Sequence, residues 1–161
     1  MRTYNLSTFH KEIDIMMTVN HPNVLSCSDY FYRESHRKHC LVLEYCSRGS
    51  LKDNFLEVFE WPDIRKVEIC YQIAMGINAL HEKDVMHRDI KSGNILFDEN
   101  FQIKVCDFGF CRTDTDVEKS VEVGSPLYRD PNVESKKYTK KCDIYSTGIT
   151  FDTIFRKTCI F

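Results

Sequence analysis

Two short runs of residues combine carboxylate, amide and basic side chains at close spacing: His87-Arg88-Asp89-Ile90-Lys91-Ser92-Gly93-Asn94 and Asp107-Phe108-Gly109. Asp89 and Asn94 are five positions apart with Lys91 between them, and Asp107 follows Asp89 by eighteen. A carboxylate beside an acceptor hydroxyl acts as a general base, and carboxylate and amide oxygens are ligands that Mg²⁺ prefers. These residue types predict phosphoryl transfer, which needs positioning and charge neutralisation more than covalent work by the protein.

The segment that joins the two runs predicts a β-hairpin. Residues 95–97 (Ile-Leu-Phe) and 103–106 (Ile-Lys-Val-Cys) predict two short strands, and Asp98-Glu99-Asn100 between them has the composition of a turn. Because an antiparallel hairpin returns the chain to the end where it started, Asn94 and Asp107 are expected to reach one metal ion.

Hydrophobic periodicity predicts the elements around this hairpin. Helices are expected over residues 8–19, from Pro62 to about Leu80, and after Lys141 to Phe155. In the longest helix, apolar residues recur every three or four positions: Ile64, Val67, Tyr71, Ala74, Ile77 and Leu80. Gly76 within it costs about 1 kcal/mol relative to alanine, which predicts close packing there. Strands are expected near residues 24–31 and 40–45 around a polar loop at 33–39, and residues 112–122 are expected to be irregular.

The composition fits one intracellular domain, cytoplasmic or nuclear. The chain has 161 residues, 42% of them hydrophobic, and a net charge of −2. It therefore has no general attraction to nucleic acid or to an anionic membrane. No run of eighteen apolar residues occurs, and residues 1–5 lack the apolar core of a signal peptide, so no membrane span or secretory signal is expected. The eight cysteines contain no Cys-x-x-Cys spacing, so we expect reduced thiols rather than disulfides or a zinc site.

The two motifs together resemble the catalytic core of a eukaryotic-type serine/threonine protein kinase. Taken alone, His87-Arg88-Asp89 is also compatible with a turn that holds a buried ion pair. The resemblance implies transfer of the ATP γ-phosphate to a protein substrate, with Asp89 as the base. It further implies that Lys91 contacts the transferred phosphate, which favours Ser/Thr over Tyr substrates. Asn94 and Asp107 would hold Mg²⁺.

The resemblance also implies a nucleotide-binding site made by residues outside the two motifs. Glu12 resembles the glutamate of the mobile N-lobe helix. Leu43 resembles the gatekeeper, and the backbone of Glu44 and Cys46 would bond the adenine edge. Leu96 would pack against the adenine face.

Further positions match the family's internal supports. Met16, Cys27, His87 and Phe108 resemble the apolar column that links the two lobes, although each is also an ordinary core residue. Asp143 resembles the aspartate of the central C-lobe helix that braces the catalytic loop. Cys106 would border the nucleotide, and we expect it to be buried and unreactive.

Residues 124–132 resemble the end of an activation segment, with Asp130-Pro131-Asn132 where the family usually has Ala-Pro-Glu. Arg88 beside the base implies control by phosphorylation, because this arginine typically pairs with a phosphate. Candidate acceptors are Ser120, Thr113 and Thr115. They are equally compatible with unmodified hydroxyls on a loop.

The resemblance implies an α+β, two-lobe fold, with a partial N-lobe and hinge at residues 1–46 and a mainly helical C-lobe at 47–161. No Gly-x-Gly occurs, and no strand lysine lies about twenty residues before Glu12. We therefore expect a domain truncated at both ends, with an unpaired strand edge and an uncovered apolar face on the last helix. Two functions remain open: a kinase that binds a protein substrate and a regulatory partner, or a non-catalytic binding or scaffold module.

Overall fold

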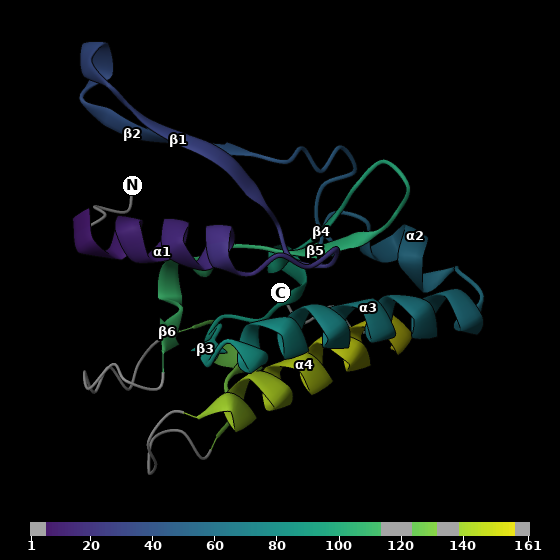
Figure 1. The fold of residues 1–161 in the computed structure, drawn as a ribbon. Helices are drawn as coiled ribbons and strands as arrows, with labels where there is room; N and C mark the ends of the chain where they lie inside the picture. Colours follow the sequence, from purple (N-terminus) through teal and green to yellow (C-terminus); the bar gives the residue numbers. More distant parts are fainter. Residues whose placement is uncertain (1–5, 114–123, 132–138, 157–161) are drawn as a thin grey trace.

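A computed structural model describes residues 6–113, 124–131 and 139–156 of the chain (Figure 1). Its helices are α1 Leu6–Thr18, α2 Phe55–Phe59, α3 Asp63–Glu82 and α4 Lys140–Phe155. The strands of the described part form three antiparallel pairs: β1 Cys27–Arg33 with β2 Lys38–Leu43, β3 Val85–Met86 with β6 Arg112–Thr113, and β4 Ile95–Phe97 with β5 Ile103–Val105. This mixture confirms the predicted α+β class.

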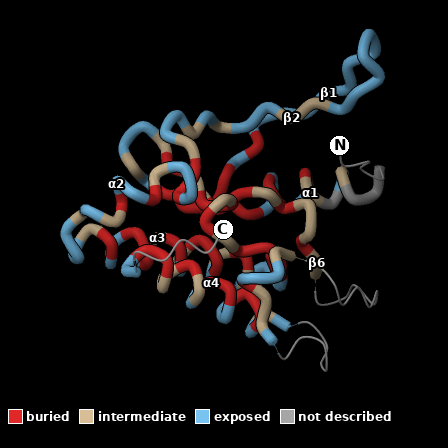
Figure 2. The backbone as a smooth tube through the Cα atoms, turned by 180° about the vertical axis from the view of Figure 1, so that it is seen from behind, coloured by how far each residue is buried: buried red, intermediate tan, exposed pale blue. Residues whose placement is uncertain are grey.

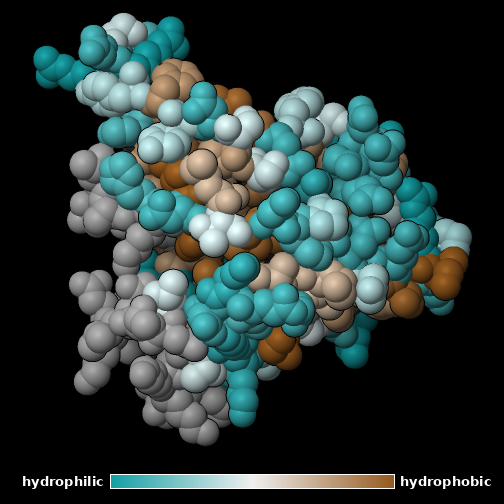
Figure 3. Space-filling view, in the orientation of Figure 1, coloured by the Kyte–Doolittle hydropathy of each residue, from teal (hydrophilic) through white to brown (hydrophobic). Residues whose placement is uncertain are grey.

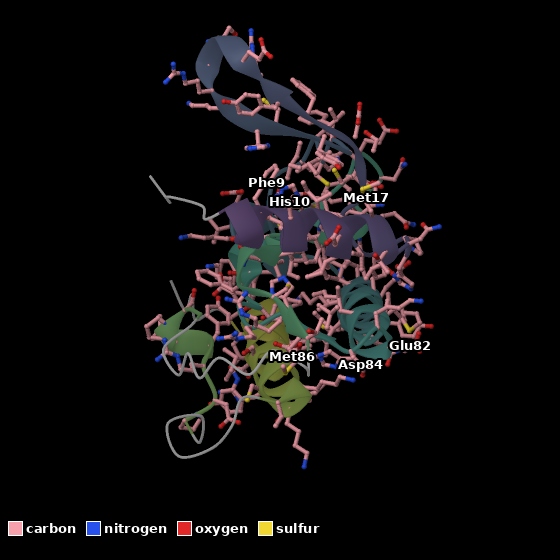
Figure 4. All side chains as sticks on the ribbon, turned by 60° about the vertical axis from the view of Figure 1, so that its left-hand side comes forward. Phe9, His10, Met17, Glu82, Asp84 and Met86 are labelled. Carbon is pink, nitrogen blue, oxygen red and sulfur yellow. The ribbon has the colours of Figure 1, made fainter. Side chains whose placement is uncertain are left out.

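Helix α1 and the β1–β2 hairpin form the smaller part of the molecule. The helix buries Ile13, Ile15 and Met16 and lies below the hairpin (Figure 1). Phe9, on the side of α1 toward the hairpin (Figure 4), contacts the ring of His39 at 4.9 Å between ring centroids. Helix α1 therefore contacts the β1–β2 hairpin on one side and the core on the other.

The β1–β2 hairpin extends away from the body, and most of it is exposed (Figure 2). The polar loop expected at residues 33–39 is shorter than predicted. Arg33 and Lys38 belong to the strands, and only a 3₁₀ turn at Glu34–His36 and Arg37 separate them. Arg37 has a left-handed backbone (φ 49°), which lets the chain reverse in so few residues.

Helix α3 confirms the predicted helix but not every residue of its apolar pattern. Its buried apolar residues are Ile69, Cys70, Ile73, Ile77 and Leu80, whereas Ile64, Val67, Tyr71 and Ala74 are exposed. Two sets of apolar residues share helical spacing here, and contacts with β5 and α4 decide which set is buried. The helix also begins at Asp63, so Pro62 is its N-cap rather than its first helical residue.

Gly76 of α3 packs closely against its neighbours, as its position predicted. A Cβ at this residue would lie 2.6 Å from the carbonyl oxygen of Asn23 and 2.9 Å from Val105. The same Asn23 carbonyl accepts the N–H of Val105 at 2.9 Å. The glycine thus lets α3 approach the chain segment that ties β5 to the loop before β1.

Four of the seven buried residues of helix α4 carry a hydroxyl group, and Ile154 is its one large apolar residue that is buried. Ser146, Thr147 and Thr150 each donate a hydrogen bond to the carbonyl four residues earlier, at 2.7 to 3.0 Å. Ile144 and Phe155 are exposed, in line with the expected uncovered apolar face. Because their hydroxyls are satisfied within the helix, these small residues can pack against the body without unpaired polar atoms.

Among the described residues, no helix is long and apolar enough to cross a membrane. The seven cysteines of the described ranges are free thiols, as expected. The short β3–β6 pair was not predicted, because the sequence had indicated an irregular segment from Arg112 onward. The pair fixes the chain directly before and after the two motifs.

Candidate active site

The carboxylate of Asp89 is the centre of the site and is only 3% exposed. Its Oδ2 accepts hydrogen bonds from Lys91 Nζ at 2.6 Å and from Asn94 Nδ2 at 3.0 Å. Its Oδ1 accepts from the backbone N–H and the hydroxyl of Ser125, at 2.9 and 3.1 Å. Asp89, Lys91 and Asn94, which the sequence singled out together, are therefore in direct contact.

Ser125 is a residue of this site that the sequence analysis missed. Its hydroxyl donates to Asp89 and accepts from Lys91 Nζ at 3.0 Å, so it connects these two residues. The preceding Gly124 has a left-handed backbone (φ 90°), and a Cβ there would lie 2.5 Å from the carbonyl oxygen of Arg88. Only glycine fits this approach, and Gly-Ser-Pro was the signal that could have revealed the contact.

The predicted metal pair lies at one end of the β4–β5 hairpin. The register pairs Ile95 with Val105, and Cys106 N–H donates to the carbonyl of Asn94 at 3.0 Å. Asn94 Nδ2 donates to both the carbonyl and the Oδ2 of Asp89, at 2.8 and 3.0 Å. With its amide nitrogen fixed, Asn94 Oδ1 accepts no hydrogen bond within the described residues. Together with Asp107 it provides an oxygen donor set that fits Mg²⁺.

Asp143 of α4 holds the loop that carries Asp89. Its carboxylate is fully buried and accepts the N–H groups of His87 and Arg88 at 2.8 Å each. His81 Nε2 lies 2.9 Å from the same carboxylate. Arg88 has a left-handed backbone (φ 70°), an uncommon conformation for a side-chain-bearing residue. The contacts of Asp143 support this backbone, which is the bracing contact that the sequence predicted.

The four residues of the predicted apolar column are all buried: Met16, Cys27, His87 and Phe108. The rings of His87 and Phe108 are in tilted contact, with centroids 5.7 Å apart. His87 Nε2 donates to the carbonyl of Cys106 at 2.9 Å, which ties the first motif to the chain before the second. Within this column, the contacts of His87 therefore connect the first motif to the second.

The residues expected around a nucleotide lie along the end of β2 and on β4. Glu44 accepts the N–H of Ser26 at 2.7 Å and pairs with Lys104 at 2.8 Å, a contact that the sequence did not indicate. Within the described residues, neither the carbonyl oxygen of Glu44 nor the N–H of Cys46 takes part in a hydrogen bond. This leaves one acceptor and one donor for the edge of a heterocyclic base.

The apolar contacts expected for that base differ in exposure. Leu43 is 40% exposed, whereas Leu96 is half-buried and packs against the core. Burial, and then the charge of Asp107, raise the pKa of the Cys106 thiol to about 12. Burial, and then the charge of Glu44, raise the pKa of the Cys46 thiol. Both thiols are therefore held in the protonated, unreactive form at neutral pH.

Of the remaining predicted residues, Glu12 and Thr113 are described and the others lie outside the described ranges. Glu12 is half-buried. The pKa of the Cys111 thiol is raised by burial first, then by the charge of Asp143 and then by that of Glu12. Thr113 pairs with Val85 in the β3–β6 ladder. The other phosphorylation candidates and the departure from Ala-Pro-Glu lie outside the described residues: Ser120, Thr115 and Asn132.

Comparison with known proteins agrees with this geometry. The protein kinase domain model matches residues 2–161. Calcium-dependent protein kinase 3 of Plasmodium yoelii yoelii is 35% identical over 152 residues, covering 91% of this chain and 28% of the relative. Calcium-dependent protein kinase 5 of Plasmodium falciparum is 34% identical over 154 residues, covering 92% and 26%. Serine/threonine-protein kinase shk2 of Schizosaccharomyces pombe is 39% identical over 142 residues, covering 86% and 24%.

The chain thus spans about a quarter of the length of these curated relatives. The family match covers both motifs, the β1–β2 hairpin and helix α4. It confirms the predicted kinase-like fold and the serine/threonine kinase resemblance. The chain belongs to the protein kinase domain family.

Proposed function

We propose that this chain provides the catalytic and Mg-ATP-binding centre of a serine/threonine protein kinase. One observation carries the proposal: the buried carboxylate of Asp89 is hydrogen-bonded to both Lys91 and Asn94. A structural ion pair alone would not require the amide of Asn94 to be fixed on the same carboxylate. Because the chain matches only a part of its relatives, the activity and substrates of the whole protein belong to this proposal.

Asp89 would act as the general base for a substrate Ser or Thr hydroxyl. The Ser125 hydroxyl donates to Asp89 Oδ1 at 3.1 Å, and a substrate hydroxyl would take the place of this hydroxyl, because the other acceptor positions of the carboxylate are occupied. Lys91 Nζ carries a positive charge beside both groups, where it would oppose the charge of a transferred phosphate. Proton transfer to a positioned base typically contributes about 10²- to 10⁴-fold in rate.

Asn94 and Asp107 would hold Mg²⁺, and the Glu44 carbonyl and Cys46 N–H would bind the adenine edge. When bound with ATP, the metal ion supplies positive charge that offsets the phosphate charge. Leu96 offers an apolar surface to the adenine face. Two observations support these roles: Asn94 and Asp107 lie next to the same end of the β4–β5 hairpin, and the Glu44 carbonyl and Cys46 N–H form no hydrogen bond within the described residues.

The test is phosphotransfer by the full-length protein with a generic Ser/Thr peptide, together with nucleotide affinity by calorimetry. We expect Asp89→Asn to lower turnover by about 10²- to 10⁴-fold and to leave Mg-ATP affinity within about twofold. Asp107→Asn should instead weaken Mg-ATP binding, because it removes a charged metal ligand. Asp63→Asn is the matched control, since its side chain is 86% exposed at the start of α3.

Two results would contradict these assignments. Retained turnover in Asp89→Asn would remove Asp89 as the base, and unchanged nucleotide affinity in Asp107→Asn would remove its metal role. If the wild-type protein shows neither turnover nor a thermal shift with millimolar Mg-ATP, the non-catalytic binding module becomes the better description. The absence of Gly-x-Gly in these 161 residues is the feature that favours that alternative.

A further inference from the structure

The outer edge of strand β1 is open and rich in aromatic residues. Among the described residues, β1 pairs on one side only, with β2, in a two-stranded sheet. Every residue of β1 after Cys27 is exposed, and Tyr30, Phe31 and Tyr32 are 45%, 48% and 50% exposed. Figure 3 shows hydrophobic residues on the hairpin between its hydrophilic tip and the body. Such an edge is a template for pairing with another strand.

The order of residues along this edge is complementary to itself. If two copies of β1 pair antiparallel about a two-fold axis at Phe31, the two Phe31 side chains lie opposite each other. Tyr30 then lies opposite Tyr32 of the second copy, and Asp29 opposite Arg33 of the second copy. Aromatic pairs and opposite charges placed directly across two strands both stabilise a sheet. The two-fold axis makes each of these pairs occur twice, except the central one.

The charges at the two ends of this segment have no such partner in their own hairpin. Arg33 lies opposite Lys38, a like charge, and Asp29 lies opposite Val42. Within the described part of the chain, neither Asp29 nor Arg33 forms an ion pair; Asp29 Oδ1 accepts only the N–H of Tyr30, at 2.8 Å. A like charge directly across a strand pair is unfavourable, so Arg33 gains from an acidic group on its open side.

The other edge of the hairpin lacks this complementarity. Two β2 strands paired about their centre would set Lys38 opposite Leu43 and His39 opposite Val42, which matches a polar side chain with an apolar one. On β1, the irregular register between Cys27 and Asp29 confines regular pairing to residues 29–33. We propose that this chain forms a symmetric homodimer in which residues 29–33 of two β1 strands pair antiparallel. The proposal does not depend on kinase activity.

The test uses charge reversal and sedimentation equilibrium of the full chain over a range of concentrations. Asp29→Arg and Arg33→Asp each place like charges opposite one another at both ends of the interface. We expect each variant alone to dimerise at least about tenfold more weakly than the wild type. When the two variants are mixed, the arginines of one chain face the aspartates of the other, so a heterodimer should form with affinity near that of the wild type.

Arg37→Asp is the matched control, because it makes the same charge change in the same hairpin but outside residues 29–33. It should leave the dimer constant within about twofold. Three results would overturn the proposal: a wild-type monomer at every concentration, a dimer insensitive to Arg33→Asp, or variants that stay apart when mixed. Circular dichroism of each variant shows whether it is folded, and the mixing experiment needs only that both variants fold.

Discussion

The carboxylate of Asp143 shows how much of the active centre depends on a single buried charge. Both of its oxygens are used, because Oδ1 accepts from Arg88 and Oδ2 from His87, with His81 beside Oδ2. A backbone N–H that loses its acceptor in the interior costs about 1–3 kcal/mol. The residue therefore stabilises the fold and the shape of the catalytic loop at once.

Asp143→Asn is expected to lower the free energy of unfolding by about 2–3 kcal/mol. One oxygen becomes an NH₂ group, which must face an N–H donor of the loop, so at least one hydrogen bond is replaced by a donor–donor contact. Urea unfolding measures the change. Asp152→Asn on the same helix removes an exposed pair with Arg156 and should cost below about 1 kcal/mol. Equal losses in the two variants would contradict a special role for Asp143.

At the scale of elements, the two helical glycines have different surroundings. A Cβ at Gly76 would lie 2.6 Å from the Asn23 carbonyl, whereas a Cβ at Gly148 would meet nothing within 4 Å. The Asn23 carbonyl also accepts from Val105, so it cannot move without loosening that hydrogen bond. The same substitution in α3 and α4 therefore has opposite effects.

We expect Gly148→Ala to raise the free energy of unfolding by about 0.5–1 kcal/mol, because alanine favours the helix. Gly76→Ala should lower it by about 1–2 kcal/mol, since overpacking exceeds the gain in helix propensity. Thermal and urea unfolding of both variants test the pair. A stabilising effect of both substitutions would mean that α3 does not approach Asn23 as closely as described.

The elements that the sequence predicted well are those with long or strongly patterned segments. Helices α1, α3 and α4 and the β4–β5 hairpin were found from periodicity and turn composition. The pair β3–β6 was missed because strands of two residues have no period. The apolar residues predicted to form the face of α3 were partly not the buried ones. Two sets of apolar residues share helical spacing on this helix, and contacts with other elements determine which set is buried.

In the site too, residues close together in the sequence were predicted, whereas a residue distant in the sequence was missed. Asp89, Lys91 and Asn94 lie within six residues, so their types and close spacing were enough to single them out, and the structure shows that Asp89 contacts both of the others. Ser125 is separated from Asp89 by 36 positions, and no period or spacing connects the two. Its place depends on the left-handed Gly124, which only the structure shows to touch Arg88.

For the molecule as a whole, buried thiols predict a loss of stability at alkaline pH. Burial and the charge of Asp107 raise the pKa of Cys106 to about 12, and burial raises that of Cys111 well above its ordinary value. An unfolded thiol has a pKa near 8.5, approximately. Above that pH the unfolded chain releases protons that the native state keeps. The contribution of these protonated thiols to the free energy of unfolding is therefore fully present below about pH 8.5 and is lost as the pH rises through the native pKa.

Each such thiol should lower the free energy of unfolding by about 1.4 kcal/mol per pH unit above about pH 8.5. Urea unfolding under reducing conditions, between about pH 8 and pH 9.5, measures this slope. Cys106→Ala should reduce this slope by the contribution of one thiol, about 1.4 kcal/mol per pH unit. Val58→Ala makes a cavity without removing a titrating group, so it should lower stability equally at every pH. An unchanged slope in Cys106→Ala would contradict the buried, protonated thiol.

The distance along the chain between the catalytic loop and Asp143 also sets an order of assembly. The carboxylate that holds His87 and Arg88 comes 56 and 55 positions later, and Ser125 comes 36 positions after Asp89. On the ribosome, the loop is synthesised before these partners. A nascent chain thus contains all the residues of the first motif before the hydrogen bonds that fix the conformation of the motif can form. The centre acquires that shape only when α4 docks, late in the synthesis of these 161 residues.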